Sequence, residues 1–277
     1  MFLLLLAIFS SAAISIVLRA STHKVQSNLS MLAANYLVCS LLGAAHIGIL
    51  PPAETSDLRA AAFLGIVNGI LLLTSFILMQ ASVRKNGVVL TSVFTKLGLL
   101  VPVMLSVLLF REMPTWLQIT GFCVAVAASI VINLNKDMGT GRFDWSLILL
   151  LLLAGGTDAM AKIYEALGPA QLSDLYLFFS FGAALVLCVP VVIFKKERPG
   201  FRELFFGVLI GVPNFFSSRF LLGALESIPA VVAYPTFSVS TLMLITLTGV
   251  LAFREKLSRR QWIALGAIVA ALIMLNV

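Results

Sequence analysis

Charge is scarce in this chain of 277 residues: 11% are charged, while 60% are hydrophobic. Soluble domains carry roughly 25% charged and about 45–50% apolar residues. A soluble fold cannot bury so much apolar surface, so the composition predicts that lipid is the solvent. The net charge of +7 would suggest nucleic acid in a soluble protein. Here the basic residues lie between apolar runs, where they orient a chain in a bilayer, and we expect no nucleic-acid partner.

Residues that build metal and redox sites are also few, with three cysteines and two histidines in the chain. All three cysteines lie inside apolar runs, which indicates packing thiols rather than disulfides or metal ligands. His23 and His46 lie near opposite ends of the second run, and no Asp-rich motif for Mg²⁺ occurs. We therefore expect no metal, no cofactor and no enzymatic activity. The lack of a phosphate-binding loop argues against ATP hydrolysis by this chain.

Aromatic rings with polar atoms are rare beside the 20 phenylalanines. The three tryptophans, Trp116, Trp145 and Trp262, each stand at the start of an apolar run, which is typical of anchors at the membrane interface. Only four tyrosines remain for an aromatic cage. The sequence therefore disfavours a quaternary-ammonium site.

Long apolar runs, by contrast, are plentiful. A helix needs about 20 apolar residues to cross a bilayer. The runs that qualify lie at 2–18, 30–50, 60–82, 87–110, 115–134, 145–165, 173–194, 203–225, 229–252 and 260–276. These runs predict an all-α integral membrane protein with ten transmembrane helices. The first run has no basic residue before its apolar core, and its first charge, Arg19, follows it, so we interpret it as a transmembrane helix rather than a signal peptide.

The end of the first half of the chain recurs at the end of the second. Residues 110–118 and 253–261 both begin Phe-Arg-Glu, end in Gln, and lead into runs closing at Asn133 and Asn276, with a constant offset throughout. Five spans per half is an odd number, so the second half enters the membrane from the opposite side. This predicts inverted five-helix repeats over 1–134 and 145–277, joined by a linker at 135–144. We interpret Glu112 and Glu255 as structural residues of tight turns, bonded to the helix starts that follow.

The basic residues of the loops predict the orientation. Nearly all lie in one set of alternate loops, and the other set contains only Arg59 and Arg111. By the positive-inside rule the basic set is cytoplasmic, which places both termini outside the cytoplasm. We expect a multi-pass protein of the plasma (inner) membrane.

These features together resemble a known family. Each half closes with Phe-Arg-Glu, a short polar turn, a Gln and a small-residue helix, and residues 155–162 form a small-residue stretch ending in Lys162. The chain resembles the EamA-type ten-helix transporters of the drug/metabolite transporter (DMT) superfamily, in which a Gly usually precedes the Glu of the closing turn; here Arg111 and Arg254 stand in that place. The resemblance implies two five-helix halves around a central cavity that work by alternating access, without naming a substrate.

Charges inside spans are the first candidates for substrate binding, since each costs about 2.5–3.5 kcal/mol or more at a helix centre. Lys96 follows Gly87 by nine residues in the fourth run and is expected near mid-membrane. Thr91, Ser92 and Thr95 give that helix a polar face. We predict that Lys96, with Thr95, anchors a carboxylate, a phosphate or another acceptor-rich group. The alternative is a structural partner for Asp158 or for backbone carbonyls.

Two further sets of charges are ambiguous. Asp158 and Lys162 are four residues apart, hence on one helical face and able to pair. They predict a gate or a proton-coupling site, or else a fixed structural pair. Arg219 suits bidentate capture of a carboxylate or phosphate, and the alternative is an interfacial arginine paired with Glu226.

Neutral residues complete the candidate binding site. Asn68 and Asn214 match at a slightly longer offset than the repeated block, which predicts one asparagine at the same depth in each half, for substrate contact or for bonding between helices. Tyr234 precedes Pro235, which is expected to distort the ninth helix and free a carbonyl that can line a site.

The balance of embedded charges suggests the substrate class. Lys96, Lys162 and Arg219 outnumber the one embedded anion, Asp158. We predict a secondary active transporter of a small polar metabolite, zwitterionic or anionic, working as a monomer or homodimer in the lipid bilayer. The alternatives are a proton-coupled exporter of cationic drugs or amines, with Asp158 holding proton and cargo in turn, and a lipid flippase of the same fold.

Overall fold

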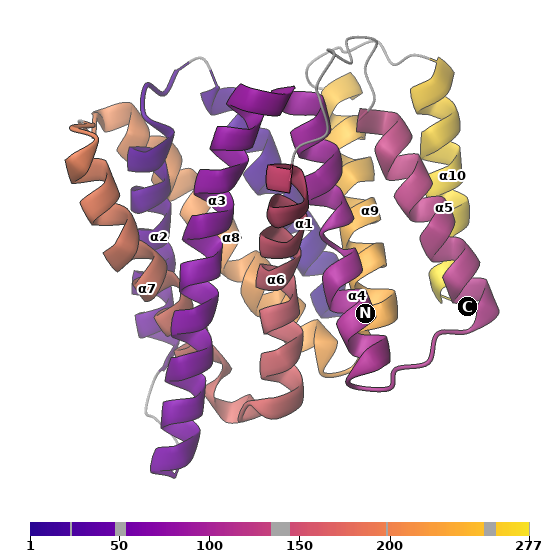
Figure 1. The fold of residues 1–277 in the computed structure, drawn as a ribbon, viewed down its shortest axis with the longest axis horizontal. Helices are drawn as coiled ribbons and strands as arrows, with labels where there is room; N and C mark the ends of the chain where they lie inside the picture. Colours follow the sequence, from indigo (N-terminus) through magenta and orange to yellow (C-terminus); the bar gives the residue numbers. More distant parts are fainter. Residues whose placement is uncertain (23, 48–53, 134–144, 198, 252–258, 277) are drawn as a thin grey trace. The chain divides into compact units, whose positions relative to one another are not determined.

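The structure is a computed structural model that describes residues 1–22, 24–47, 54–133, 145–197, 199–251 and 259–276 (Figure 1). Several predictions fall outside these ranges: the linker at 135–144, His23, and Phe253 to Ser258 of the second repeated block with its Glu255. Within the described ranges the chain forms helices and no strands. The all-α prediction is therefore confirmed.

The helices follow the apolar runs closely. Their bounds are α1 (Phe2–Ser21), α2 (Asn28–Ile47), α3 (Thr55–Leu97), α4 (Leu100–Leu108), α5 (Trp116–Asn133), α6 (Trp145–Leu167), η1 (Ala170–Leu172), α7 (Ser173–Phe194), α8 (Phe201–Leu225), α9 (Ala230–Leu251) and α10 (Arg259–Asn276). Among the described residues, eight helical segments are long and apolar enough to cross a membrane, and α5 adds a shorter apolar stretch. The chain is a multi-pass membrane protein. The count of ten spans and their inversion stay predictions.

The third run and the start of the fourth form α3, which is kinked at Gly87, and the rest of the fourth run contains α4. Gly87 interrupts α3 with φ 81° and ψ 164°, a backbone conformation that costs glycine little because it has no Cβ. The chain turns again at Gly98 and Leu99, before α4 begins. Pro102 accounts for the second turn, since a proline ring clashes with the carbonyl four residues earlier, here that of Gly98.

The repeated block begins the fifth helix through a capping box. The Gln118 N–H donates to Thr115 Oγ1 at 3.2 Å, and the Thr115 N–H donates to Gln118 Oε1 at 3.0 Å. Reciprocal bonds of this kind satisfy backbone donors at a helix start. At the offset of the sequence repeat, Gln118 of this capping box corresponds to Gln261 of α10.

The chain divides into two compact units, and each unit mixes helices from both halves of the sequence. The first unit contains residues 1–73 and 163–226, and the second contains 74–162 and 227–277. In the first unit, α8 packs against α1 and α2, and α2 also packs against α7. In the second unit, α5 packs against α10, and α9 packs against α4 and α10. The pairs α2–α7 and α5–α10 are visible side by side in Figure 1. Helices that the predicted repeat would make equivalent therefore pack on each other.

Glycines spaced four apart allow close backbone contact in the first unit. Gly65 and Gly69 of α3 face backbone carbonyls of α7, and Gly207 and Gly211 of α8 face backbone carbonyls of α2. A methyl group at Gly69 would lie 2.4 Å from the Ser180 carbonyl oxygen, well inside van der Waals contact. Small residues of this spacing are a common packing surface between membrane helices.

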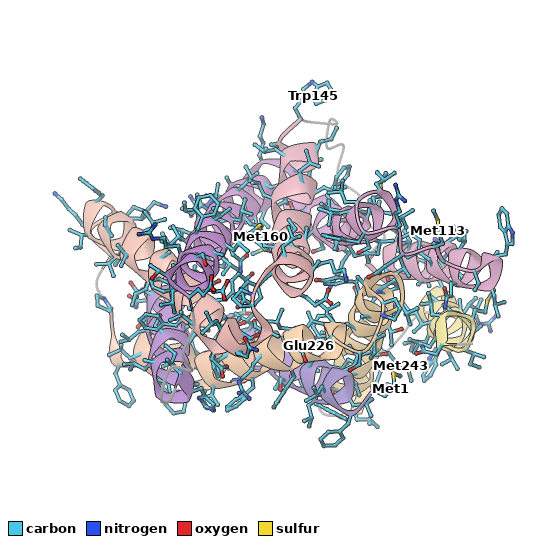
Figure 2. All side chains as sticks on the ribbon, turned by 90° about the horizontal axis from the view of Figure 1, so that it is seen from below. Met1, Met113, Trp145, Met160, Glu226 and Met243 are labelled. Carbon is cyan, nitrogen blue, oxygen red and sulfur yellow. The ribbon has the colours of Figure 1, made fainter. Side chains whose placement is uncertain are left out.

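The outward surface of the helices is apolar, as lipid contact requires. Large hydrophobic side chains are exposed along several spans, for example Phe9 of α1, Phe63 of α3 and Val186 of α7. Trp145 is 77% exposed at the start of α6 and projects away from its helix (Figure 2). An exposed tryptophan at a helix start fits the expected interfacial anchor.

The turn before α5 carries backbone strain at Arg111. Arg111 has φ 55°, in the left-handed region that suits glycine, and a Gly is usual at this place in the family that the chain resembles. We expect Arg111→Gly to stabilise the protein by about 1 kcal/mol, measured as a higher midpoint of thermal unfolding in detergent. Lys196, with φ 51°, is expected to respond in the same way. Lys195→Gly, at a right-handed position, serves as control, and a stabilising effect there would contradict the explanation.

Candidate functional site

The candidate site lies in the second compact unit, where α3 and α6 cross. Lys96 is in the last turn of α3 and Asp158 is in α6, and their side chains interact electrostatically. The helices touch beside them, because a methyl group at Gly155 would lie only 2.1 Å from the Gly98 carbonyl oxygen. Lys96 precedes Gly98 by two residues, and Asp158 follows Gly155 by three. The glycine contact brings the two spans together near an ammonium and a carboxylate that interact with each other.

Tyr234 brings α9 to the same place. Its side chain is 2% exposed, and its hydroxyl donates to the backbone carbonyl of Asp158 at 2.6 Å. Helix α9 runs without interruption through Pro235, so the expected distortion does not break the helix. The hydroxyl of Thr95, the residue before Lys96 in α3, donates to the Thr91 carbonyl at 2.8 Å within its own helix. The structure thus brings three predicted residues together on three helices of one unit, Lys96 with Asp158 and Tyr234 with the backbone of Asp158.

Lys162 has a different role from the one predicted. Its ammonium forms an ion pair with Glu112, at 2.7 Å from Oε1, and the two side chains are 6% and 18% exposed. The proposed Asp158–Lys162 pair followed from helical spacing, but Glu112 reaches Lys162 from the turn before α5, far away in the sequence. Asp158 interacts with Lys96 instead.

Glu112 also differs from expectation. Its Oε2 accepts the N–H groups of Ala230 at 2.7 Å and Val231 at 3.4 Å, at the start of α9. The sequence predicted a bond to the helix that follows it, but the start of α5 is capped by Thr115 and Gln118. A carboxylate at a helix N-terminus satisfies exposed backbone donors and interacts favourably with the helix dipole.

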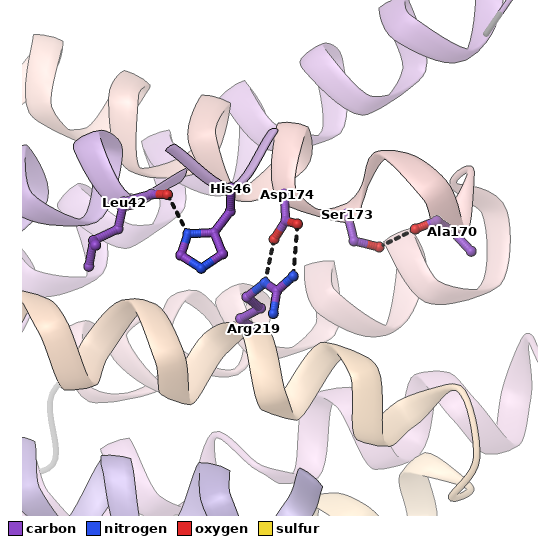
Figure 3. Close-up of polar contacts among 6 residues, drawn as sticks. All are labelled: Leu42, His46, Ala170, Ser173, Asp174 and Arg219. Carbon is purple, nitrogen blue, oxygen red and sulfur yellow. Dashed lines mark hydrogen bonds and ion pairs between the residues drawn. The ribbon is translucent and has the colours of Figure 1, made fainter. Parts of the chain in front are cut away.

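Arg219 belongs to the first compact unit and pairs with Asp174. Its Nε and Nη2 donate to the two carboxylate oxygens at 2.6 and 3.0 Å, as Figure 3 shows. The expected partner, Glu226, lines the same cavity of about 230 Å³ beside Arg219 without an ion pair to it among the described contacts. The sequence analysis did not predict Asp174 as the partner of Arg219. The available signal was that Asp174 is an acidic residue in the first turn of α7.

The two asparagines bond to neighbouring helices of the first unit. Asn68 Nδ2 donates to Ser180 Oγ at 3.3 Å, and Asn214 Nδ2 donates to Asn35 Oδ1 at 3.1 Å. Asn68 lies between Gly65 and Gly69 of α3, and Asn214 follows Gly211 of α8. The equivalence of the two asparagines in the two halves stays a prediction, and their contacts favour bonding between helices.

Comparison with known proteins identifies the fold family. A sequence model of the EamA-like transporter family matches residues 1–134 and 144–277. The chain belongs to the EamA-like transporter family. This EamA protein is 23% identical over 278 residues to an uncharacterized protein of Haemophilus influenzae, a match covering 95% of this chain and 93% of that protein. A crystal structure with 17% identity superposes with a TM-score of 0.76 over 99% of this chain and 94% of that chain, which shows a shared fold. The family makes this EamA protein a membrane transporter of the DMT type.

Proposed function

We propose that the protein is a secondary active transporter of a small zwitterionic or anionic metabolite, and that Lys96 binds the acidic group of the substrate. The observation that carries the proposal is the placement of Lys96 opposite Asp158 at the α3–α6 crossing. A zwitterion offers one group for each of these charges. It can therefore replace their mutual attraction by two new pairs without leaving a charge uncompensated in a low-dielectric site.

The other polar residues fall into two groups: those proposed to contact substrate and those with a structural role. Thr95 precedes Lys96 in α3, and Tyr234 donates to the backbone carbonyl of Asp158; both are proposed to contact substrate. Arg219, Asn68 and Asn214 are in the other compact unit, each with a partner on a neighbouring helix, which supports a structural role. Asp158 is also the candidate for a coupling proton, as a carboxylate within a span.

The mechanism proposed is alternating access by inverted repeats over 1–134 and 145–277. The sequence repeat at the starts of the fifth and tenth helices and the packing of α2 on α7 and of α5 on α10 support the duplication. The bias of basic residues supports extracytoplasmic termini in the plasma membrane. A cysteine placed at the C-terminus should react with an impermeant thiol reagent in intact cells, and a terminus that reacts only after lysis would contradict this orientation.

The substrate class is tested by a thermal-shift screen of the purified protein. The panels are amino acids, organic acids, sugar phosphates and organic cations. We expect stabilisation by zwitterions or anions, lost in Lys96→Ala and retained in Lys195→Ala, which removes an exposed lysine at the end of α7. Stabilisation by cations alone, unchanged in Lys96→Ala, would exclude the proposed substrate class and favour the exporter of cationic drugs.

A further inference from the structure

A single carboxylate connects the two helices that carry Asp158 and Tyr234. Glu112 lies in the turn between α4 and α5, with one oxygen on the Lys162 ammonium of α6 and the other on the first N–H groups of α9. Lys162 is four residues after Asp158, and Ala230 is four residues before Tyr234. Four residues make about one helical turn, or roughly 6 Å of helix. Glu112 therefore holds α6 and α9 one turn away from the place where Tyr234 meets Asp158.

We propose that Glu112 is a positioning residue for the substrate site, acting through the Tyr234–Asp158 contact. Its two oxygens fix the register between α6 and α9, and that register decides whether the Tyr234 hydroxyl reaches the Asp158 carbonyl. The inference rests on the proposed function for its link to transport. The register itself is measurable without any substrate.

The surroundings of Lys162 make the ion pair with Glu112 hard to replace. Lys162 is a buried side chain, and its ammonium lies 5.4 Å from the centre of the Phe110 ring. Glu112→Gln keeps a side chain of the same length and an acceptor for the α9 N–H groups, but it removes the charge that compensates Lys162. Removing one partner of a buried pair is more disruptive than removing both. We expect Glu112→Gln with Lys162→Met to be less impaired than Glu112→Gln alone.

The register is tested by spin labels on the two helices. Leu149 of α6 and Leu251 of α9 are 49% and 81% exposed, so cysteines introduced at these positions can be modified with nitroxide labels. The exposed native cysteine, Cys123, is first changed to Ala so that it is not labelled. Leu149 is about 20 Å along α6 from Lys162, which amplifies a change of helix angle. We expect a narrow distance distribution in the otherwise unaltered protein and a shifted or broadened one in Glu112→Gln. Glu226→Gln, an exposed carboxylate at the end of α8, is the matched control. An unchanged distribution in Glu112→Gln would overturn the proposal.

The link to the site is tested by a double-mutant cycle with Tyr234→Phe, which removes the hydroxyl. The probe is initial uptake of a ¹⁴C-labelled amino-acid mixture into proteoliposomes containing equal amounts of folded protein. We expect Glu112→Gln to lower uptake by about tenfold, but by less than about twofold in the Tyr234→Phe background, because coupled residues are non-additive. Equal losses in both backgrounds would show a purely structural role and overturn the positioning. If the unaltered protein takes up none of the mixture, amino acids are excluded as substrates, and the spin-label distances still decide the register.

Discussion

Lys96→Ala is expected to lower uptake of the transported zwitterion or anion by about 100-fold or more. Truncating one partner of a buried, hydrogen-bonded charge pair costs about 2–5 kcal/mol, and the substrate would lose its partner within the span. The loss should appear as uptake by proteoliposomes and as the absence of ligand-induced stabilisation. Lys96→Arg, which keeps the charge, is expected to retain part of the activity.

The same substitution separates the two transport classes. Removing Lys96 takes a positive charge away from Asp158, so binding of an organic cation should be spared or improved. Improved cation uptake together with unaffected zwitterion uptake would contradict the assignment of Lys96 and favour the cationic-drug exporter.

Gly155→Val is expected to destabilise the protein by at least about 3 kcal/mol, because overpacking of this severity forces backbone movement. The first added carbon would lie 2.1 Å from the Gly98 carbonyl oxygen and 2.6 Å from a methyl of Val101. Neither helix can yield easily, since one of the contacts is backbone. The measurement is the fraction of monodisperse protein after detergent extraction and its midpoint of thermal unfolding.

The matched control is Gly182→Val in α7. No packing neighbour lies within 4 Å of a Cβ built at Gly182, and the change of helix propensity is the same at both sites. We expect Gly182→Val to stay folded. Equal destabilisation at Gly155 and Gly182 would show that propensity, rather than the α3–α6 crossing, determines the result.

The sequence predicted the helices well and their polar partners poorly. Apolar length and interrupting glycines locate a span directly, so the break at Gly87 could be anticipated. Helical spacing, in contrast, detects only neighbours on the same helix, and it paired Lys162 with Asp158. The actual partner, Glu112, comes from a turn whose place beside α6 depends on tertiary packing.

A signal for this pair was nevertheless present in the repeat. At the offset of the repeated block, Lys162 corresponds to Arg19 and Glu112 corresponds to Glu255, so a basic residue and the turn glutamate recur together in both halves. Asp174 had no counterpart in such a pattern and required the structure.

The mixing of both halves in each compact unit has a consequence for how the protein is made. When the first five predicted spans have been synthesised, α2 still lacks α7 and α8, and α5 still lacks α10, on which they pack. Until the second half has been inserted, lipid must therefore cover the packing surfaces of the first half. Neither half is expected to form a stable unit when expressed alone, and the two halves should recover the fold only when they are produced together in one membrane.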